Sequence, residues 1–95
     1  MTIKDCLPET EILAQLAEES TELAQAALKL RRVLDGTNPT PATEVEGWEH
    51  LMEEYADVLN CIDALHLDLG DMEIVSIYRQ EKMTSWLARL EGRDE

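Results

Sequence analysis

Apolar residues recur every three or four positions through most of the chain, which is the spacing of one face of an α-helix. The first run of this kind extends from Ile12 to Leu34. Pro8 suits the first turn of that helix, and Gly36 suits its C-terminal cap. The segment 37–43 contains two prolines among short polar residues, so it predicts a loop rather than a continued helix.

The second half of the chain shows the same periodicity. Thr43 followed by Glu46 matches a capping box and predicts the start of a second helix, which the apolar spacing continues to Gly70. Asp71 is a candidate N-cap for a third helix that ends near Leu90. No segment alternates apolar and polar residues with the period of a strand, so the sequence predicts an all-α fold.

Length and element order indicate a single domain, residues 1–95, with flexible ends at 1–7 and 92–95. The first two helices have similar lengths and a short connection, so we expect an antiparallel helical hairpin, followed by a third helix. A chain of 95 residues without Phe builds only a modest core. We therefore expect it to bury further surface as a homodimer or homotetramer, with hairpins paired into a four-helix-bundle type of core.

The formal net charge of −13 argues against binding a nucleic-acid polymer or an anionic membrane surface. Nucleotides stay open as ligands, because bound divalent cations neutralise both an acidic pocket and a phosphate chain. No apolar run has the length of a signal peptide core or a membrane span. The two cysteines, Cys6 and Cys61, are too few for a disulfide scaffold, so we expect reduced thiols and a cytoplasmic protein.

Two short acidic clusters carry the strongest indication of chemistry. Glu19 and Glu22 share one face of the first helix, and Glu54 and Asp57 share one face of the second. The two clusters fall at similar depths in the expected hairpin, so four carboxylates converge between the helices. Oxygen ligands of this kind are those that a hard divalent cation prefers.

These clusters also carry a family resemblance. The patterns Glu18-Glu19-Ser20-Thr21-Glu22 and Glu54-Tyr55-Ala56-Asp57, with Leu16-Ala17 and Val58-Leu59 beside them, resemble the signature of the MazG-like all-α nucleoside triphosphate pyrophosphohydrolases. The resemblance implies hydrolysis of a ribo- or deoxyribonucleoside triphosphate to its monophosphate and pyrophosphate, as housecleaning of the nucleotide pool. It implies Mg²⁺ as cofactor, with Mn²⁺ as a substitute, and four metal ligands: Glu19, Glu22, Glu54 and Asp57.

The remaining site residues follow from the same resemblance. Glu18, with Glu19 next to it, is expected to take part in catalysis, either as the base that orients the attacking water or by supporting a metal ligand. Lys82 and Arg89 are expected to contact phosphates, although mid-helix lysines mostly face solvent. Where an Arg is often found in the family, Trp86 stands instead. Asn60 is a candidate for binding a base, a sugar or a ligand carboxylate, and a buried structural amide is the other interpretation.

The alternative function is a non-catalytic, acidic helical module that binds another protein. It rests on the negative charge and on the amphipathic helices, both of which are common. The two interpretations differ over the acids, because an interaction module has no reason to oppose Glu22 and Asp57 across two helices.

Overall fold

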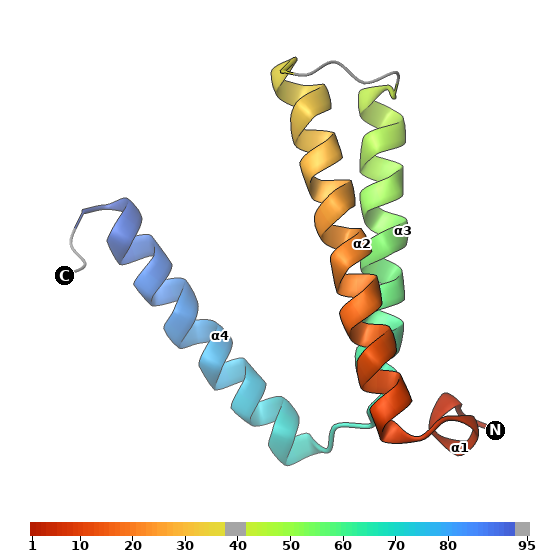
Figure 1. The fold of residues 1–95 in the computed structure, drawn as a ribbon. Coiled ribbons are helices and arrows are strands. Elements are labelled where there is room, and N and C mark those ends of the chain that lie inside the picture. The colour runs from red at the N-terminus through yellow and green to blue at the C-terminus, as the bar shows by residue number, and fades with distance from the viewer. Residues whose placement is uncertain (38–41, 93–95) are drawn as a thin grey trace.

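The computed structural model describes residues 1–37 and 42–92, and within them every regular element is a helix (Figure 1). The all-α prediction is therefore confirmed for the described residues. The predicted loop falls partly outside them, at 38–41, and so do residues 93–95 of the predicted C-terminal end. The elements are α1 (Ile3–Cys6), α2 (Glu9–Asp35), α3 (Glu44–Ala64) and α4 (Leu69–Leu90).

The ends of the hairpin helices follow the predicted capping residues. Gly36 ends α2 in the left-handed conformation, with φ at 71°, and its N–H donates to the Arg32 carbonyl at 3.0 Å. At the start of α3, the Glu46 N–H donates to Thr43 Oγ1 at 3.2 Å, and the Thr43 N–H donates to Glu46 Oε1 at 3.0 Å. This reciprocal pair confirms the capping box.

Three boundaries differ from the prediction. The second helix ends at Ala64 and not at Gly70, because Asp68 begins a new helix: its Oδ1 accepts from the Asp71 N–H at 2.8 Å. Asp71 is thus the third helical residue of α4 and not its cap. At the start of α2, Pro8 is the N-cap and not a first-turn residue.

The N-terminal segment 1–7 contains α1, a single turn that the sequence analysis placed in a flexible end. The Asp5 N–H donates to Thr2 Oγ1 at 3.3 Å, and the Thr2 N–H donates to Asp5 Oδ2 at 2.8 Å. The hydrogen bonds to Thr2 lower the pKa of Asp5 below its ordinary value. A local capping box therefore forms this turn without any buried residue.

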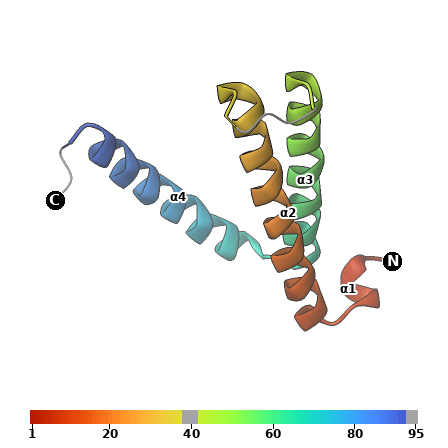
Figure 2. The same ribbon diagram turned by 45° about the horizontal axis from the view of Figure 1, so that its top comes forward.

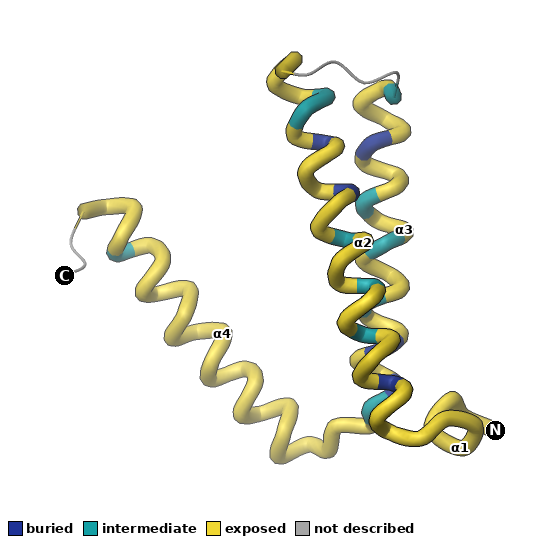
Figure 3. Tube along the Cα trace, in the orientation of Figure 1, coloured by how far each residue is buried: buried dark blue, intermediate teal, exposed yellow. Residues whose placement is uncertain are grey.

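Helices α2 and α3 pack against each other as the antiparallel hairpin that the sequence predicts (Figures 1 and 2). Their buried residues form a narrow seam on the facing surfaces (Figure 3). The two helices pack closely at Gly47, where an added Cβ would come within 2.9 Å of Leu30 Cδ1. The buried residues of the seam are Ile12, Ala26, Leu30, Gly47, Cys61 and Ala64.

Helix α4 diverges from the hairpin in both ribbon views, and none of its residues is buried. The radius of gyration is 17.1 Å, whereas a compact domain of this length has about 12 Å. The accessible surface is 7671 Å², compared with about 5,500 Å² for a compact monomer of this mass. Thus α4 does not complete the core of its own hairpin, and the expected oligomer is not part of this structure.

None of the helices in residues 1–37 and 42–92 has the length and apolar composition that a membrane span requires.

Candidate functional site: an acidic cluster between two helices

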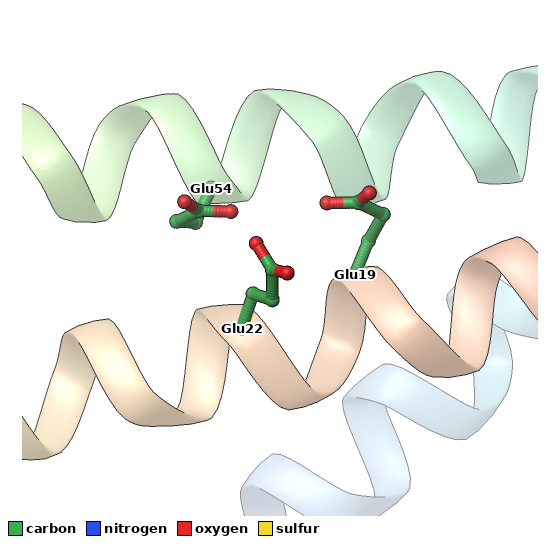
Figure 4. A group of neighbouring side chains, drawn as sticks. All are labelled: Glu19, Glu22 and Glu54. Atoms are coloured by element: carbon green, nitrogen blue, oxygen red, sulfur yellow. The ribbon is translucent and has the colours of Figure 1, made fainter.

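Three of the four predicted ligands come together in the middle of the hairpin. Glu19 and Glu22 project from α2, and Glu54 projects from α3 toward them (Figure 4). One carboxylate oxygen of each residue lies within 4.8 Å of the others. A single cation could therefore contact all three side chains after small rotamer changes.

Helix geometry explains this convergence. Glu19 and Glu22 are three residues apart and so lie on one face of α2. That face also carries Leu23 and Ala26, whose packing turns it toward α3. Glu54 lies two turns after Gly47, on the α3 face that contacts α2. The close packing at Gly47 thus helps to set the distance across which the acids meet.

Glu54 is the most enclosed member of the cluster. Its side chain is 13% exposed, and its Oε2 atom is buried without a hydrogen-bond partner within the described residues. Loss of hydration and the nearby charge of Glu22 raise the pKa of Glu54 above its ordinary value, and Asp57 and Glu19 contribute in the same direction. A carboxylate in this position is stabilised by a cation more than by any neighbour in the cluster.

Two neighbouring residues, which the sequence analysis did not select, contact acids of the cluster. Gln15 Nε2 donates to Glu19 Oε1 at 2.8 Å. His50 Nε2 lies 3.8 Å from Glu54 Oε1, close enough for an ion pair when the imidazole is protonated. Each residue precedes its acid by four positions, and that spacing on a helix was the signal that could have identified both.

The other predicted catalytic and metal-binding residues lie at the edge of this group. Asp57 is exposed and is not one of the three residues whose oxygens meet. It is close enough, however, to raise the pKa values of both Glu54 and Cys61. Glu18 is exposed on α2, one position from Glu19. The structure therefore forms a three-carboxylate centre with Asp57 beside it.

The predicted substrate-binding residues are not brought to the acids within one chain. Lys82 and Arg89 belong to the half of α4 that lies farthest along its divergent path (Figure 1). Asn60 lines a hollow of about 660 Å³ near the junction of α3 and α4, together with Asp63 and His66. It is exposed, so the interpretation as a buried structural amide does not hold in this chain.

A different cation, Lys29, belongs to the hairpin itself. Lys29 lines a hollow of about 310 Å³ between α2 and α3, and His50, the neighbour of Glu54, lines the same hollow. The acids Glu46, Glu49 and Glu53 also line it. His50, the ion-pair neighbour of Glu54, is the link between this hollow and the carboxylate cluster.

Comparison of the chain with protein-family models, with curated proteins and with solved structures finds no match, so the site is interpreted from its own residues.

Proposed function

We propose that the chain is a Mg²⁺-dependent hydrolase that cleaves a nucleoside triphosphate to the monophosphate and pyrophosphate. The observation that supports this most is the meeting of Glu19, Glu22 and Glu54 within 4.8 Å, from two helices. Like charges so arranged repel one another, and a buried Glu54 oxygen has no protein partner among the described residues. A divalent cation relieves both costs.

The donor set favours a hard cation. All three side chains supply carboxylate oxygens, which suit Mg²⁺ and Mn²⁺ and not a thiophilic metal. The only nearby thiol is Cys61, and burial raises its pKa, with Glu19 and Asp57 adding to the rise. A protonated thiol is not a metal ligand. Glu19, Glu22 and Glu54 would hold the metal, and Asp57, exposed beside them, would bind a second ion or an ordered water.

Different side chains of the protein have different roles in the proposed reaction. A bound Mg²⁺ would offset the charge of the triphosphate and would lower the pKa of the attacking water. Glu18, exposed beside Glu19, accepts a hydrogen bond from that water and so orients it. Lys29 attracts phosphate oxygens in the neighbouring hollow. Lys82 and Arg89 take part in binding when α4 is brought over a site, which this chain alone does not do.

The wider setting belongs to the same proposal. The reaction would serve housecleaning of the nucleotide pool in the cytoplasm, and the chain would act as a homodimer or homotetramer. The second candidate function, a non-catalytic interaction module, is favoured by one observation: large apolar side chains are exposed along both α3 and α4.

Product analysis separates the two functions. The protein is incubated with a panel of ribo- and deoxyribonucleoside triphosphates, with and without Mg²⁺, and the products are resolved by ion-exchange chromatography. Direct appearance of monophosphate and pyrophosphate, only with Mg²⁺, supports the hydrolase. Glu22→Gln is expected to abolish this turnover, whereas Glu73→Gln, an equal charge change on exposed α4, is expected to preserve it. Absence of turnover together with absence of a Mg²⁺-induced thermal shift would favour the interaction module.

A further inference from the structure

Helix α3 carries a second apolar stripe that does not face α2. Its six members follow one another at intervals of three and four residues, which is the spacing of a helix–helix seam. All six are exposed, between 37% for Ile62 and 65% for Val45. The stripe consists of Val45, Trp48, Met52, Tyr55, Leu59 and Ile62.

This stripe borders an apolar groove about 330 Å³ in volume, lined by Leu23, Trp48, Leu51, Met52 and Tyr55. At 100° per residue, Trp48 and Tyr55 lie on the side of α3 opposite His50 and Asp57. Leu23 and Leu51, from the same lining, neighbour Glu22 and Glu54 on their helices. A helix seated in the groove therefore passes beside the acidic cluster.

Helix α4 presents a complementary surface. Its main apolar stripe is exposed and contains a single cation, Arg79, at its centre. A cation enclosed by apolar side chains requires an acidic partner. The residues on this side of α4 are Met72, Val75, Arg79, Met83, Trp86, Leu87 and Leu90.

Charge and length both match between the two stripes. Helix α3 contains seven acidic residues and no Lys or Arg, whereas α4 contains three acidic and three basic residues. The 22 residues of α4 and the 21 of α3 give helices of about 33 Å and 32 Å. The apolar face of α4, which includes Arg79, therefore matches the stripe on α3 in length. The acidic residues of α3 offer partners for Arg79.

The connection between α3 and α4 directs this contact away from the chain's own hairpin. It comprises Leu65 to Asp68, and both ends are fixed: the Leu65 N–H donates to the Ile62 carbonyl at 3.2 Å, and Asp68 caps α4. Between them His66 takes a left-handed φ of 53°. With this geometry α4 diverges from α2 and α3 in both views (Figures 1 and 2).

The surface area agrees with burial of these stripes in an assembly. The chain exposes 7671 Å², about 2,100 Å² more than a compact monomer of its mass. Obligate homodimers bury about 1,000–2,500 Å² per chain. We propose that two copies exchange their fourth helices, so that α4 of each packs along the Val45–Ile62 stripe of the other and Arg79 meets an acidic side chain of the partner's α3. This assembly does not depend on the proposed catalytic activity.

The two tryptophans report on the two stripes separately, because Trp48 belongs to α3 and Trp86 to α4. Sedimentation analysis is expected to give the mass of a dimer, or of an even multiple of it. Met83→Glu, within the α4 stripe, is expected to dissociate the assembly. Ile77→Glu is the matched control, since both side chains are 51% exposed and Ile77 lies on the other side of α4.

Emission spectra of the single-tryptophan variants Trp86→Phe and Trp48→Phe then locate the interface. Each spectrum is recorded with and without Met83→Glu, and the proposal requires that both tryptophans shift to longer wavelength on dissociation. A dimer that Met83→Glu does not dissociate would indicate hairpin-on-hairpin pairing, and a shift confined to Trp86 would indicate α4-on-α4 pairing; either overturns the exchange. A monomeric mass for the unmodified chain overturns it as well, including the case in which α4 folds onto its own hairpin.

Discussion

Gly47 links the packing of the hairpin to the geometry of the acidic cluster, and replacing it by Ala tests that link. The new Cβ would lie 2.9 Å from Leu30 Cδ1, about 0.6–1.1 Å closer than a favourable carbon–carbon contact. Leu30 is 5% exposed and packs within the seam, so its movement disturbs the other buried residues. Overpacking of this size costs about 1–3 kcal/mol.

The same substitution also improves helix propensity, by about 1 kcal/mol. The net expectation for Gly47→Ala is therefore destabilisation by about 1 kcal/mol, seen as a fall in melting temperature of about 4–8 °C. Thermal and urea unfolding, followed by circular dichroism, measure both quantities. Because the hairpin must widen two turns from Glu54, the thermal shift produced by Mg²⁺ is expected to fall as well.

A double-mutant cycle with Leu30→Val identifies the cause. Valine has no Cδ1, so the close contact is absent and only the gain in helix propensity remains. In the Leu30→Val background, Gly47→Ala is expected to stabilise by up to about 1 kcal/mol, which reverses its sign. Destabilisation by the same amount in both backgrounds would refute the argument that Gly47 is required by the contact with Leu30.

Two further predictions concern the groups whose pKa values the site raises. Glu54→Gln is expected to stabilise the metal-free protein at neutral pH. The pKa of Glu54 is raised in the folded state, so the protonated side chain favours folding at a pH below the pKa of the unfolded state. This contribution to stability is lost as the pH rises through the pKa of the folded state. Unfolding across pH 4–8 checks this, and the variant should lose both that pH dependence and the Mg²⁺-induced shift. Cys61, buried and with a raised pKa, is expected to react with iodoacetamide far more slowly than exposed Cys6. Mass spectrometry of the labelled protein decides this, and equal labelling of the two thiols would contradict the packing of the seam.

The sequence was sufficient for those features that depend on local geometry. The apolar spacing and the caps at Gly36 and Thr43 identify α2 and the start of α3, because each is specified within a few residues. The depth of the acids in the hairpin likewise follows from the lengths of its two helices. That is why Glu19, Glu22 and Glu54 belong to the predicted ligand set, whose fourth member, Asp57, is exposed and outside the three-acid group.

The errors lie where two local signals compete. Asp68 and Asp71 are both good N-caps, and Gly70 between them resembles a helix stop. The structure selects Asp68 because its side chain and that of Asp71 can each accept an N–H from the other, at 2.8 Å and 3.3 Å. The short turn α1 was missed for a related reason, since a capping box without a following apolar run is a weak signal in sequence.

The position of α4 is a different kind of problem, because it is not determined by residues near it in the sequence. The apolar periodicity predicts that α4 is a helix and that one side of it packs against another surface. It does not identify that surface. In this chain the α3 stripe and the α4 stripe are both exposed. The periodicity that predicts the hairpin thus also predicts two apolar stripes of similar length that have no packing partner within the hairpin. Lys82 and Arg89 lie on the helix that carries one of these seams, so whether they approach the carboxylates depends on where α4 packs. The carboxylate cluster is formed by the hairpin alone, whereas the position of the α4 cations relative to it is set by contacts outside the hairpin.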